Sequence, residues 1–587
     1  MRLQISRTKN AASFYVVKSA YVNKKRTSII VEKLGTEKHI CETYDVDDAE
    51  AWARAYVEEL NRKSQEEESA VSVSISFSPV RSIPLNERRS FNAGYLFLQS
   101  VYYDLGLDKI CTAIKRKHKF DFNLNSILSR LVYARIIYPG SKKSTFELSD
   151  RFIEQPDFEL HHIYRALSML ALEADYIQST LYKNSLKLSK RKTGIVYYDC
   201  TNYYFEIEQE AGIKQYGYSK EHRPNPIVQM GLFMDGDGIP LAFCINPGNT
   251  NEQITMKPLE KKLLEDFSLS RFVVCTDAGL SSTDNRIYNS LYDRAFITTQ
   301  SVKKLRDYQE EWLLAENGWK KFGEGTKTYA ISDLDEETDR EMILYKERWF
   351  TENGFEQRMI VTYSLKYRDY LRTLRRRQID RAERRIDNPS RLKRRPTNDD
   401  KRFIREERCT PDGEIASKAV YSLDEDRIRY EEKYDGFYAV CTNLEDDAQE
   451  IIKVNRRRWQ IEECFRIMKH EFKARPAYLQ NDDRITAHFM TCFIALIVYR
   501  YLEIRLNNEC TAEQLISQLQ DMNMTKLEGY GYIPSYDRNE LTDELHKVFG
   551  FDTSMELIPI ARMRNICMNT KKKQKAGAPP TPTHSET

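Results

Sequence analysis

Several features that define other protein classes are missing from this chain of 587 residues. Its eleven cysteines are scattered and form no Cys-x-x-Cys pair, which argues against a disulfide framework. We expect reduced cysteines in apolar surroundings, with zinc ligation left open as the minor alternative. The amino-terminal segment MRLQISRTKN is not a signal peptide. These absences indicate a cytosolic protein.

Long hydrophobic runs are missing as well. The most apolar stretch, residues 489–499, is too short to span a bilayer, so the sequence predicts a buried helix there and no role in a membrane. Hydrophobic residues make up 41% of the chain and charged residues 30%, as in ordinary globular proteins. At about 150 residues per domain, the length indicates three or four units.

An excess of charge of one sign is also lacking overall, because the net charge is only +3. The distribution is uneven, however, since residues 366–405 contain sixteen Lys and Arg but six Asp and Glu. Such a run is either a solvated helical face or an arm that binds a polyanion. The basic hairpin at 14–34 and the KRKHK motif at 115–119 are further candidate DNA contacts.

The pattern of apolar residues changes several times along the chain. Alternation at 14–34 predicts a β-hairpin around the turn Asn23-Lys24-Lys25, and helical spacing follows at 46–63 and again at 90–190. The predicted organisation is as follows: 1–63, hairpin and helix, a candidate DNA-binding unit; 64–89, linker; 90–190, helical DNA-binding region; 191–300, first part of an α/β core; 301–435, β-containing insertion with the basic arm; 436–505, second part of the core; 506–570, C-terminal helical region; 571–587, disordered tail.

The α/β core is predicted from the order of its elements. From residue 194 the sequence reads as three strands joined partly by the turn DGDG, then helix, strand, helix and strand. This β-β-β-α-β-α-β order matches the mixed sheet of a ribonuclease H-like core. Asp235 and Asp237 in DGDG are interpreted as turn residues, because Asp and Gly suit a hairpin turn.

Two aspartates on predicted strands of this core point to chemistry. Asp199 interrupts the apolar strand GIVYYDCTNYYF, where an unpaired carboxylate is costly to bury, and Asp277 ends the strand FVVCTD. In a ribonuclease H-like sheet these two strands are neighbours, so we expect the carboxylates to face each other and to need a divalent cation. A hydrogen-bonded structural role for Asp199 remains the alternative.

A third carboxylate is expected from the helix in RRRWQIEECFRIMK, residues 456–469. At about 100° per residue, Glu462 lies on a stripe beside the packed face, together with the cations Arg458, Arg466 and Lys469. Glu463 is expected to project away as the more solvated acid. Three cations beside one acid make sense if the stripe meets DNA phosphates.

These residues resemble those of insertion-sequence DDE transposases of the insertion-sequence-four type, which have a β-rich insertion before the final Glu. The family signature Y-x2-R-x3-E-x6-K is matched by Arg458, Glu462 and Lys469, whereas Asn455 stands at the Tyr position. TDAGL at 276–280 and the segment 217–250 are also similar to the family.

The resemblance implies cut-and-paste DNA transposition with two Mg²⁺ ions, or Mn²⁺ as a substitute, held by Asp199, Asp277 and Glu462. It implies that Arg458 and Lys469 hold phosphates and that an aromatic residue of the insertion stacks on a flipped base. Trp349 is a candidate for that role, although a core position is the more common one for a tryptophan.

The implied partners are double-stranded DNA, both element ends and target, and a second copy of the chain in a synaptic homodimer. The implied setting is the bacterial cytoplasm, in association with the nucleoid. Two alternatives stay open: a ribonuclease H-like nuclease or resolvase without strand transfer, and a domesticated DNA-binding protein that no longer cuts.

Overall fold

The structure is a computed structural model that describes residues 2–7, 12–22, 25–44, 46–69, 73, 79–269, 271–291, 294–324, 327–352, 354–387, 400–409 and 415–572. The predicted turn at 23–25 and the tail at 571–587 therefore lie largely outside the described residues, as does the end of the basic arm at 388–399. The chain divides into two compact units, 1–87 and 88–587, which are described separately.

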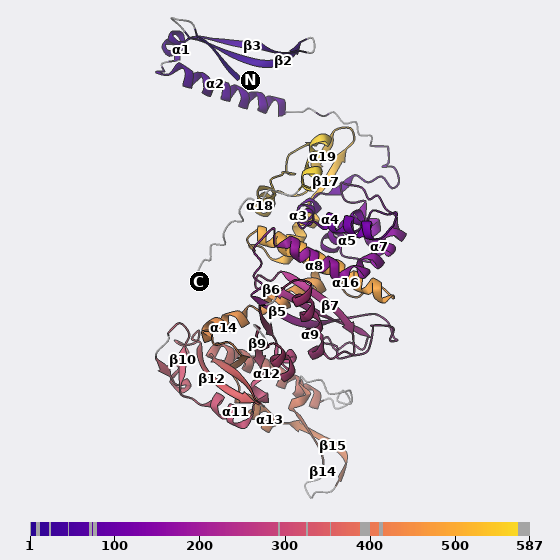
Figure 1. The fold of residues 1–587 in the computed structure, drawn as a ribbon, viewed down its shortest axis with the longest axis vertical. Helices are drawn as coiled ribbons and strands as arrows, with labels where there is room; N and C mark the ends of the chain where they lie inside the picture. Colours follow the sequence, from indigo (N-terminus) through magenta and orange to yellow (C-terminus); the bar gives the residue numbers. More distant parts are fainter. Residues whose placement is uncertain are drawn as a thin grey trace. The chain divides into compact units, whose positions relative to one another are not determined.

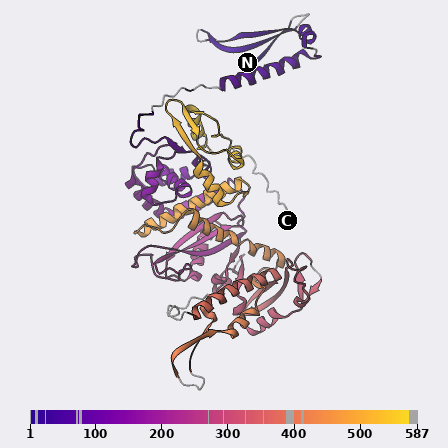
Figure 2. The same cartoon turned by 180° about the vertical axis from the view of Figure 1, so that it is seen from behind.

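The first unit is a three-stranded antiparallel sheet with two helices (Figures 1 and 2). Alternating apolar residues of the strands face α2 and form a small core with it, including Phe14, Val16 and Val57. The predicted hairpin and helix are present, and an additional strand precedes them. The elements are β1 (Arg2–Arg7), β2 (Ala12–Val22), β3 (Lys25–Thr36), α1 (Glu37–Tyr44) and α2 (Ala49–Ser69).

The second unit begins with the helices predicted for 90–190. Side-chain caps such as Asn123 and Ser141 mark two of their starts, as expected from the preference of Asn and Ser for that position. The helices are α3 (Tyr95–Asp104), α4 (Leu107–Lys117), α5 (Leu124–Ile137), α6 (Lys142–Ser149), α7 (Leu160–Leu172) and α8 (Ala174–Ser185).

A ten-stranded mixed sheet forms the centre of the second unit, in the order β11-β10-β12-β13-β16-β9-β8-β5-β6-β7. Strand β5 pairs antiparallel with β6 and parallel with β8, and β8 pairs parallel with β9. The predicted order of strands and helices is present. The elements are β5 (Ile195–Tyr204), β6 (Ile227–Asp235), β7 (Pro240–Pro247), α9 (Glu252–Glu265), β8 (Val273–Thr276), α10 (Thr283–Tyr288) and β9 (Ala295–Gln300).

Four strands of the predicted insertion, β10 to β13, extend this same sheet, whereas β14 and β15 form a separate ribbon. Strand β13 pairs with β16, and β16 pairs antiparallel with β9, so residues 301–435 are continuous with the core sheet. The elements are α11 (Asp307–Leu314), β10 (Trp319–Lys321), β11 (Thr328–Tyr329), β12 (Leu344–Glu352), β13 (Phe355–Tyr363), α12 (Leu365–Ile386), β14 (Ile404–Cys409), β15 (Ile415–Leu423), α13 (Glu425–Glu432) and β16 (Phe437–Thr442).

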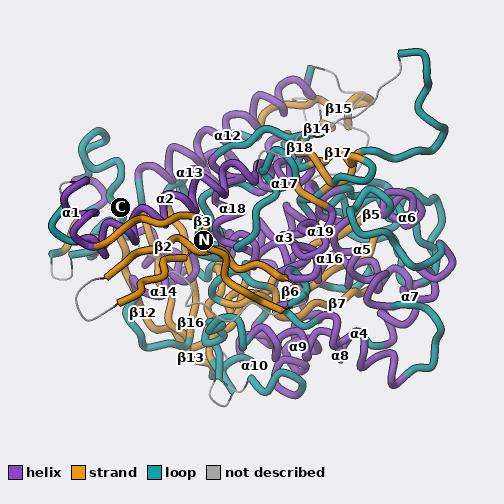
Figure 3. The backbone as a smooth tube through the Cα atoms, turned by 90° about the horizontal axis from the view of Figure 1, so that it is seen from above, coloured by secondary structure: helices purple, strands orange, loops and turns teal. Residues whose placement is uncertain are grey.

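The basic arm consists of the long helix α12 and the two-stranded ribbon β14-β15. Helix α12 runs beside α13 (Figure 3), and Ala382, Phe403 and Ile428 form a small shared core between them. The ribbon pairs with no other strand among the described residues and projects from this core in Figure 1. The arm is therefore held to the rest of the unit by few apolar contacts.

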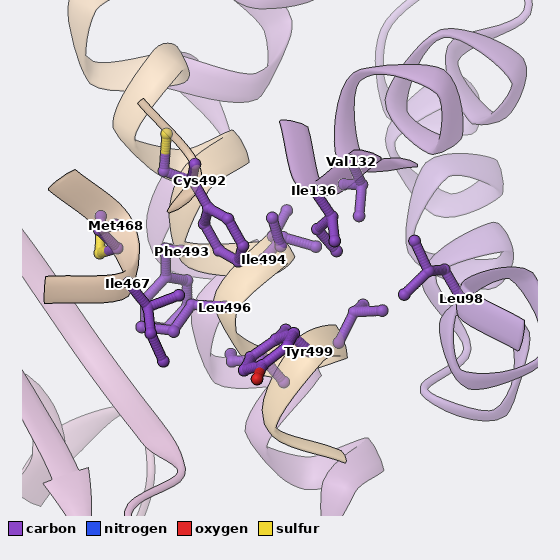
Figure 4. Close-up of a cluster of buried hydrophobic side chains, with 14 of the residues drawn as sticks. Leu98, Val132, Ile136, Ile467, Met468, Cys492, Phe493, Ile494, Leu496 and Tyr499 are labelled. Carbon is purple, nitrogen blue, oxygen red and sulfur yellow. The ribbon is translucent and has the colours of Figure 1, made fainter. Parts of the chain in front are cut away.

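Helix α16 (Asp482–Arg505) is the centre of the main core. Its side chains Cys492, Phe493 and Leu496 lie between the helical region, with Val132 and Ile136, and the segment around Met468 (Figure 4). The helix is long and apolar enough to cross a membrane, but 94% of its most apolar window is buried in the protein. The prediction of a buried helix is confirmed, although the helix is longer than the 489–499 run indicated.

The remaining elements of the second unit are β4, near its start, and those that follow β16. Residues 506–570 contain strands that the helical prediction missed, because β17 and β18 are short and depend on distant partners, including β4 near residue 90. The elements are β4 (Ser90–Asn92), α14 (Ala448–Arg456), α15 (Trp459–Arg466), the π-helical turn Ile467–Glu471, α17 (Ala512–Asp521), β17 (Asn523–Leu527), β18 (Gly531–Pro534), α18 (Glu540–Phe549), β19 (Ile558–Pro559) and α19 (Ile560–Asn569).

The ten cysteines whose surroundings are described carry no disulfide bond, and seven of them are buried. The prediction of reduced cysteines in apolar surroundings agrees with this arrangement.

Candidate active site

The parallel pairing of β5 with β8 determines where the two aspartates lie. Tyr197 pairs with Cys275, so the same register places Asp199 opposite Asp277 at the carboxyl end of β8. Because alternate residues of a strand share a face, Asp199 lies on the face that carries Tyr197, and Asp277, directly after β8, is near enough for its charge to act on Asp199. The structure therefore brings Asp199 and Asp277 near each other at the carboxyl end of β8.

Burial dominates the electrostatics of Asp199, which is only 9% exposed. Its Oδ1 accepts a hydrogen bond from the Cys200 backbone N–H at 2.7 Å. Burial raises the pKa of Asp199 to about 7, the Lys220 ammonium opposes that rise, and the charge of Asp277 adds to it. Asp277 thus makes the charge of Asp199 less favourable, as expected for a carboxylate pair that a cation would stabilise.

Asp277 is held by its backbone turn. Its Oδ1 accepts a hydrogen bond from Leu280 N–H at 3.1 Å, which makes Asp277 the cap of the short helical turn Ala278–Leu280. Its carbonyl oxygen accepts from the Thr298 hydroxyl of β9 at 3.2 Å. These contacts fix the carboxylate at the sheet edge and leave its second oxygen without a described protein donor.

Helices α14 and α15 cover the same face of the sheet. The Tyr197 hydroxyl donates to the Val454 carbonyl at 2.9 Å, and Cys275 lies 3.7 Å from Asn455 Oδ1. Ile461 and Cys464 of α15 share the main apolar core with Tyr197 and Cys275. The helix that carries Glu462 is thus packed on the face that carries Asp199.

The two adjacent glutamates differ from our expectation. Glu463 is the less exposed acid, at 28% of its side chain against 59% for Glu462, because it is paired with Arg466 at 2.6 Å and also feels Arg500 of α16. The prediction that Glu463 is the solvated acid was wrong. Glu463 pairs with Arg466, three residues further along the chain, and the charge of Arg500 on α16 also acts on it, which helical periodicity did not reveal.

Arg458 links Glu462 to the aspartates. Its Nη2 lies 3.3 Å from Glu462 Oε1, and its side chain is 19% exposed. Burial opposes the charge of Arg458, but Tyr438, Glu462, Asp199 and Asp277 outweigh that effect and raise the pKa of Arg458. The guanidinium is therefore in the field of all three predicted acids.

Two of the three predicted acids suit a divalent cation. Asp199 and Asp277 provide the carboxylate oxygens that Mg²⁺ prefers, and they are close enough for their charges to interact. Glu462, however, is turned to Arg458, and within the described residues no group of three or more His, Cys, Asp or Glu side chains could hold a metal ion. The chemistry fits a cation at the two aspartates, and the structure does not bring Glu462 to them.

The other predicted cations occupy different places. Lys469 is 13% exposed and 3.6 Å from Glu221, and its pKa is lowered to about 8 by burial and by Lys220, which Asp199 partly offsets. Arg466 pairs with Glu463 and Glu471 and is not brought to the aspartates. The π-helical turn after Arg466 departs from ideal helical spacing, so Arg466 and Lys469 do not share one stripe.

A cavity of about 320 Å³ opens beside Glu462. Trp459 at its rim is 59% exposed, which sequence periodicity did not single out. Trp349 on β12 is 40% exposed, so its interpretation as a core tryptophan was wrong, but it does not line the cavity. The lining residues are Ile343, Ile360, Thr362, Ser364, Tyr367, Gly436, Tyr438, Val440, Ile452, Asn455, Arg456, Arg458, Trp459 and Glu462.

Asn455, at the Tyr position of the signature, contacts a tyrosine from another element. Its Nδ2 donates to the Tyr438 hydroxyl at 2.8 Å, and that hydroxyl is 2.8 Å from Thr299 Oγ1. Tyr438 lies on β16 and lines the cavity. A phenol hydroxyl is therefore present next to Asn455, supplied by a strand and not by the signature helix.

A protein-family profile described as "Transposase DDE domain" matches residues 199–498, which are 300 of the 587 residues and include all three predicted acids. No curated protein gives a significant sequence match. Among solved structures, a piggyBac transposase synaptic complex with hairpin DNA matches with 8% identity and a TM-score of 0.34, over 84% of this chain and 87% of that chain. A TM-score this low does not establish a shared fold.

Proposed function

The chain belongs to the transposases with a DDE domain, and on that premise we propose that it cuts DNA at the ends of its own insertion sequence and joins those ends to target DNA. The observation that carries this proposal is the register that sets Asp199 opposite Asp277, on the face covered by the Glu462 helix. The family supplies the reaction class, and this geometry supports the site.

We also propose that the core is ribonuclease H-like. The order β7-β6-β5-β8-β9, with β5 antiparallel to β6 and parallel to β8, supports this assignment. In that fold the middle of the first strand lies beside the carboxyl end of the fourth strand. Asp199 is on the first of these strands, β5, and Asp277 directly follows the other, β8. The insertion-sequence-four type is proposed from Arg458, Glu462 and Lys469 at the signature spacing.

The proposed roles follow from the positions of the side chains. Asp199 and Asp277 would hold Mg²⁺, and Glu462 would join them after leaving Arg458. A bound pair of such ions supplies an activated oxygen nucleophile and stabilises the leaving oxygen. Arg458, released by Glu462, would bind a phosphate of the cleaved strand, and Lys469 would do the same once it leaves Glu221. Arg466 is proposed as a more distant phosphate contact.

The cavity beside Glu462 is proposed to accept a DNA base next to the cut. Trp459, Tyr438 and Tyr367 offer aromatic surfaces, and Arg456 and Arg458 offer charges for the flanking phosphates. Trp349 remains the alternative, as an exposed aromatic residue of the extended sheet. A synaptic homodimer on two element ends, in the bacterial cytoplasm and in association with the nucleoid, completes the proposal.

The test uses the purified full chain with a plasmid that carries a marker gene between the inverted repeats of the source DNA. With Mg²⁺ and target DNA we expect excision and insertion products. Asp199→Asn, Asp277→Asn and Glu462→Gln should each lower both products by about a hundredfold or more. The matched control Asp237→Asn removes a turn carboxylate paired with Lys192 and should leave the activity unchanged.

The outcomes separate the competing functions. Cleavage without joining would favour a nuclease or resolvase. DNA binding without cleavage would favour a domesticated binding protein. Full activity of Asp199→Asn would contradict the proposed site.

A further inference from the structure

A lysine ammonium, that of Lys220, lies beside the Asp199/Asp277 pair in this structure. The Lys220 ammonium donates to the carbonyl oxygen of Cys200, the residue next to Asp199, at 2.5 Å. The same ammonium lies 3.3 Å from Oε1 of Glu252 at the start of α9. Lys220 thus lies between the aspartates and a further carboxylate that the triad does not include.

The backbone holds Lys220 in this place. Asn202 of β5 donates to the Tyr218 carbonyl at 3.1 Å and accepts from Lys220 N–H at 3.3 Å. Gly217 and Gly248 approach so closely that a Cβ on Gly217 would lie 1.9 Å from the Gly248 oxygen. The backbone before Lys220 is therefore packed against Gly248, four residues before Glu252. The side chains of Lys220 and Glu252 are the parts that can change conformation.

The charges on this site agree with the geometry. Burial opposes the charge of Lys220, but Asp199, Glu252 and Asp277 outweigh burial and raise the pKa of Lys220. The ammonium therefore stays charged and offsets part of the repulsion between the two aspartates. A divalent cation that enters the same place must displace this charge, because two cations a few ångströms apart repel each other strongly in a partly buried site.

We propose that Lys220 is the resident counter-ion of the Asp199/Asp277 pair and that, when a divalent cation binds, it leaves the Cys200 carbonyl beside the aspartates and keeps its pairing with Glu252. Its ammonium keeps the paired carboxylates compatible with folding before the metal arrives. Glu252 keeps the displaced charge paired and is not a metal ligand. This inference rests on the proposed function, since it needs the aspartates to bind a cation.

The test measures Mn²⁺ binding to the full chain without DNA, from the electron paramagnetic resonance signal of free Mn²⁺ at about pH 8. Lys220→Met removes the competing charge, so we expect binding about fivefold tighter or more. Lys220→Gln keeps an N–H donor near the Cys200 carbonyl and should show the same gain if Lys220→Met is unstable. The matched control Lys262→Met, on α9 and paired with Asp175 at 2.7 Å, should bind as the wild type does.

Glu252→Gln tests the displacement itself. It should weaken Mn²⁺ binding several-fold in the wild-type background, because the displaced Lys220 ammonium then has no carboxylate other than the aspartates with which to pair. In the Lys220→Met background the same change should have little effect. An equal loss in both backgrounds would make Glu252 a ligand and would overturn the proposal.

Wild-type or weaker affinity in both Lys220 variants would also overturn it. A different result would contradict the proposed function itself: Mn²⁺ binding that is unchanged in Asp199→Asn.

Discussion

At the level of single residues, Lys142 places an amino group where the surrounding protein offers it no acid. It is 4% exposed, and its Nζ has no hydrogen-bond partner among the described residues. Burial lowers the pKa of Lys142 from 10.5 to about 7, and Arg135 adds to the effect. Arg135 in turn donates to the carbonyl of Phe472, just after the signature helix. Lys142 and Arg135 therefore lie next to the segment that follows the helix of Glu462.

Lys142→Met should stabilise the protein. Between pH 7 and 10.5 the unfolded chain holds a proton that folded Lys142 has released, so wild-type stability rises with pH across that window. Below pH 7 the full penalty applies. We expect the variant to gain about 2 kcal/mol or more at pH 7. Thermal midpoints from pH 6 to pH 10 should show a gap that narrows as pH rises, and a constant gap or a less stable variant would contradict this account.

Trp459, which lines the cavity, and Trp349, which does not, are the two candidates for stacking on a DNA base. Trp459→Ala should lower end cleavage about tenfold, since stacking on one base contributes roughly 1–3 kcal/mol. Trp349→Ala should change cleavage by less than about twofold, because Trp349 is outside the cavity lining. Both side chains are exposed, so thermal midpoints should not move. A larger loss from Trp349→Ala would indicate that Trp349, and not Trp459, stacks on the DNA base.

At the level of elements, the basic arm is attached through a buried ion pair. Arg375 of α12 donates to both oxygens of Asp435, at 2.7 and 2.6 Å, and the side chains are 9% and 5% exposed. Asp435 lies in the turn just before β16. This contact ties α12 to the end of a strand in the ten-stranded sheet.

Asp435→Ala should loosen the arm without disturbing the active site, because it leaves the Arg375 charge buried with weaker compensation. The expected local cost is about 3 kcal/mol. Hydrogen exchange should accelerate in α12 and β15 and stay slow in β5. Asp426→Ala breaks an exposed pair with Arg429 and serves as the control, with no change in exchange. Faster exchange throughout the sheet would contradict a local role for the ion pair.

Sequence patterns predicted the core elements well for a physical reason. The apolar runs around Asp199 and Asp277 have strand length and are bounded by turn residues, so local information was enough. The pairing of β13 with β16 and of β17 with β4 joins distant segments and leaves no local signal. The charge of Arg500 acts on Glu463 from another helix, and the position of Lys220 depends on Asn202, so neither could be predicted from spacing.

At the level of the whole molecule, the two compact units have separate apolar cores. The first unit carries exposed cations, among them Arg2, Lys33 and Lys38, and is a predicted DNA-binding element. A chain that lacks residues 1–87 should remain folded and bind Mn²⁺ as the full chain does.

Its affinity for end DNA should fall, and the slope of log affinity against log salt should become shallower as phosphate contacts are lost. Fluorescence anisotropy at several salt concentrations measures both. Unchanged affinity and slope would exclude the first unit as a DNA contact.

The most direct measurement of the central claim is anomalous diffraction from Mn²⁺ in crystals of the full chain with end DNA. Our account predicts Mn²⁺ about 2.1 Å from carboxylate oxygens of Asp199 and Asp277, with Glu462 turned from Arg458 to the same site. Mn²⁺ bound elsewhere, with Asp199 and Asp277 free of metal, would contradict it.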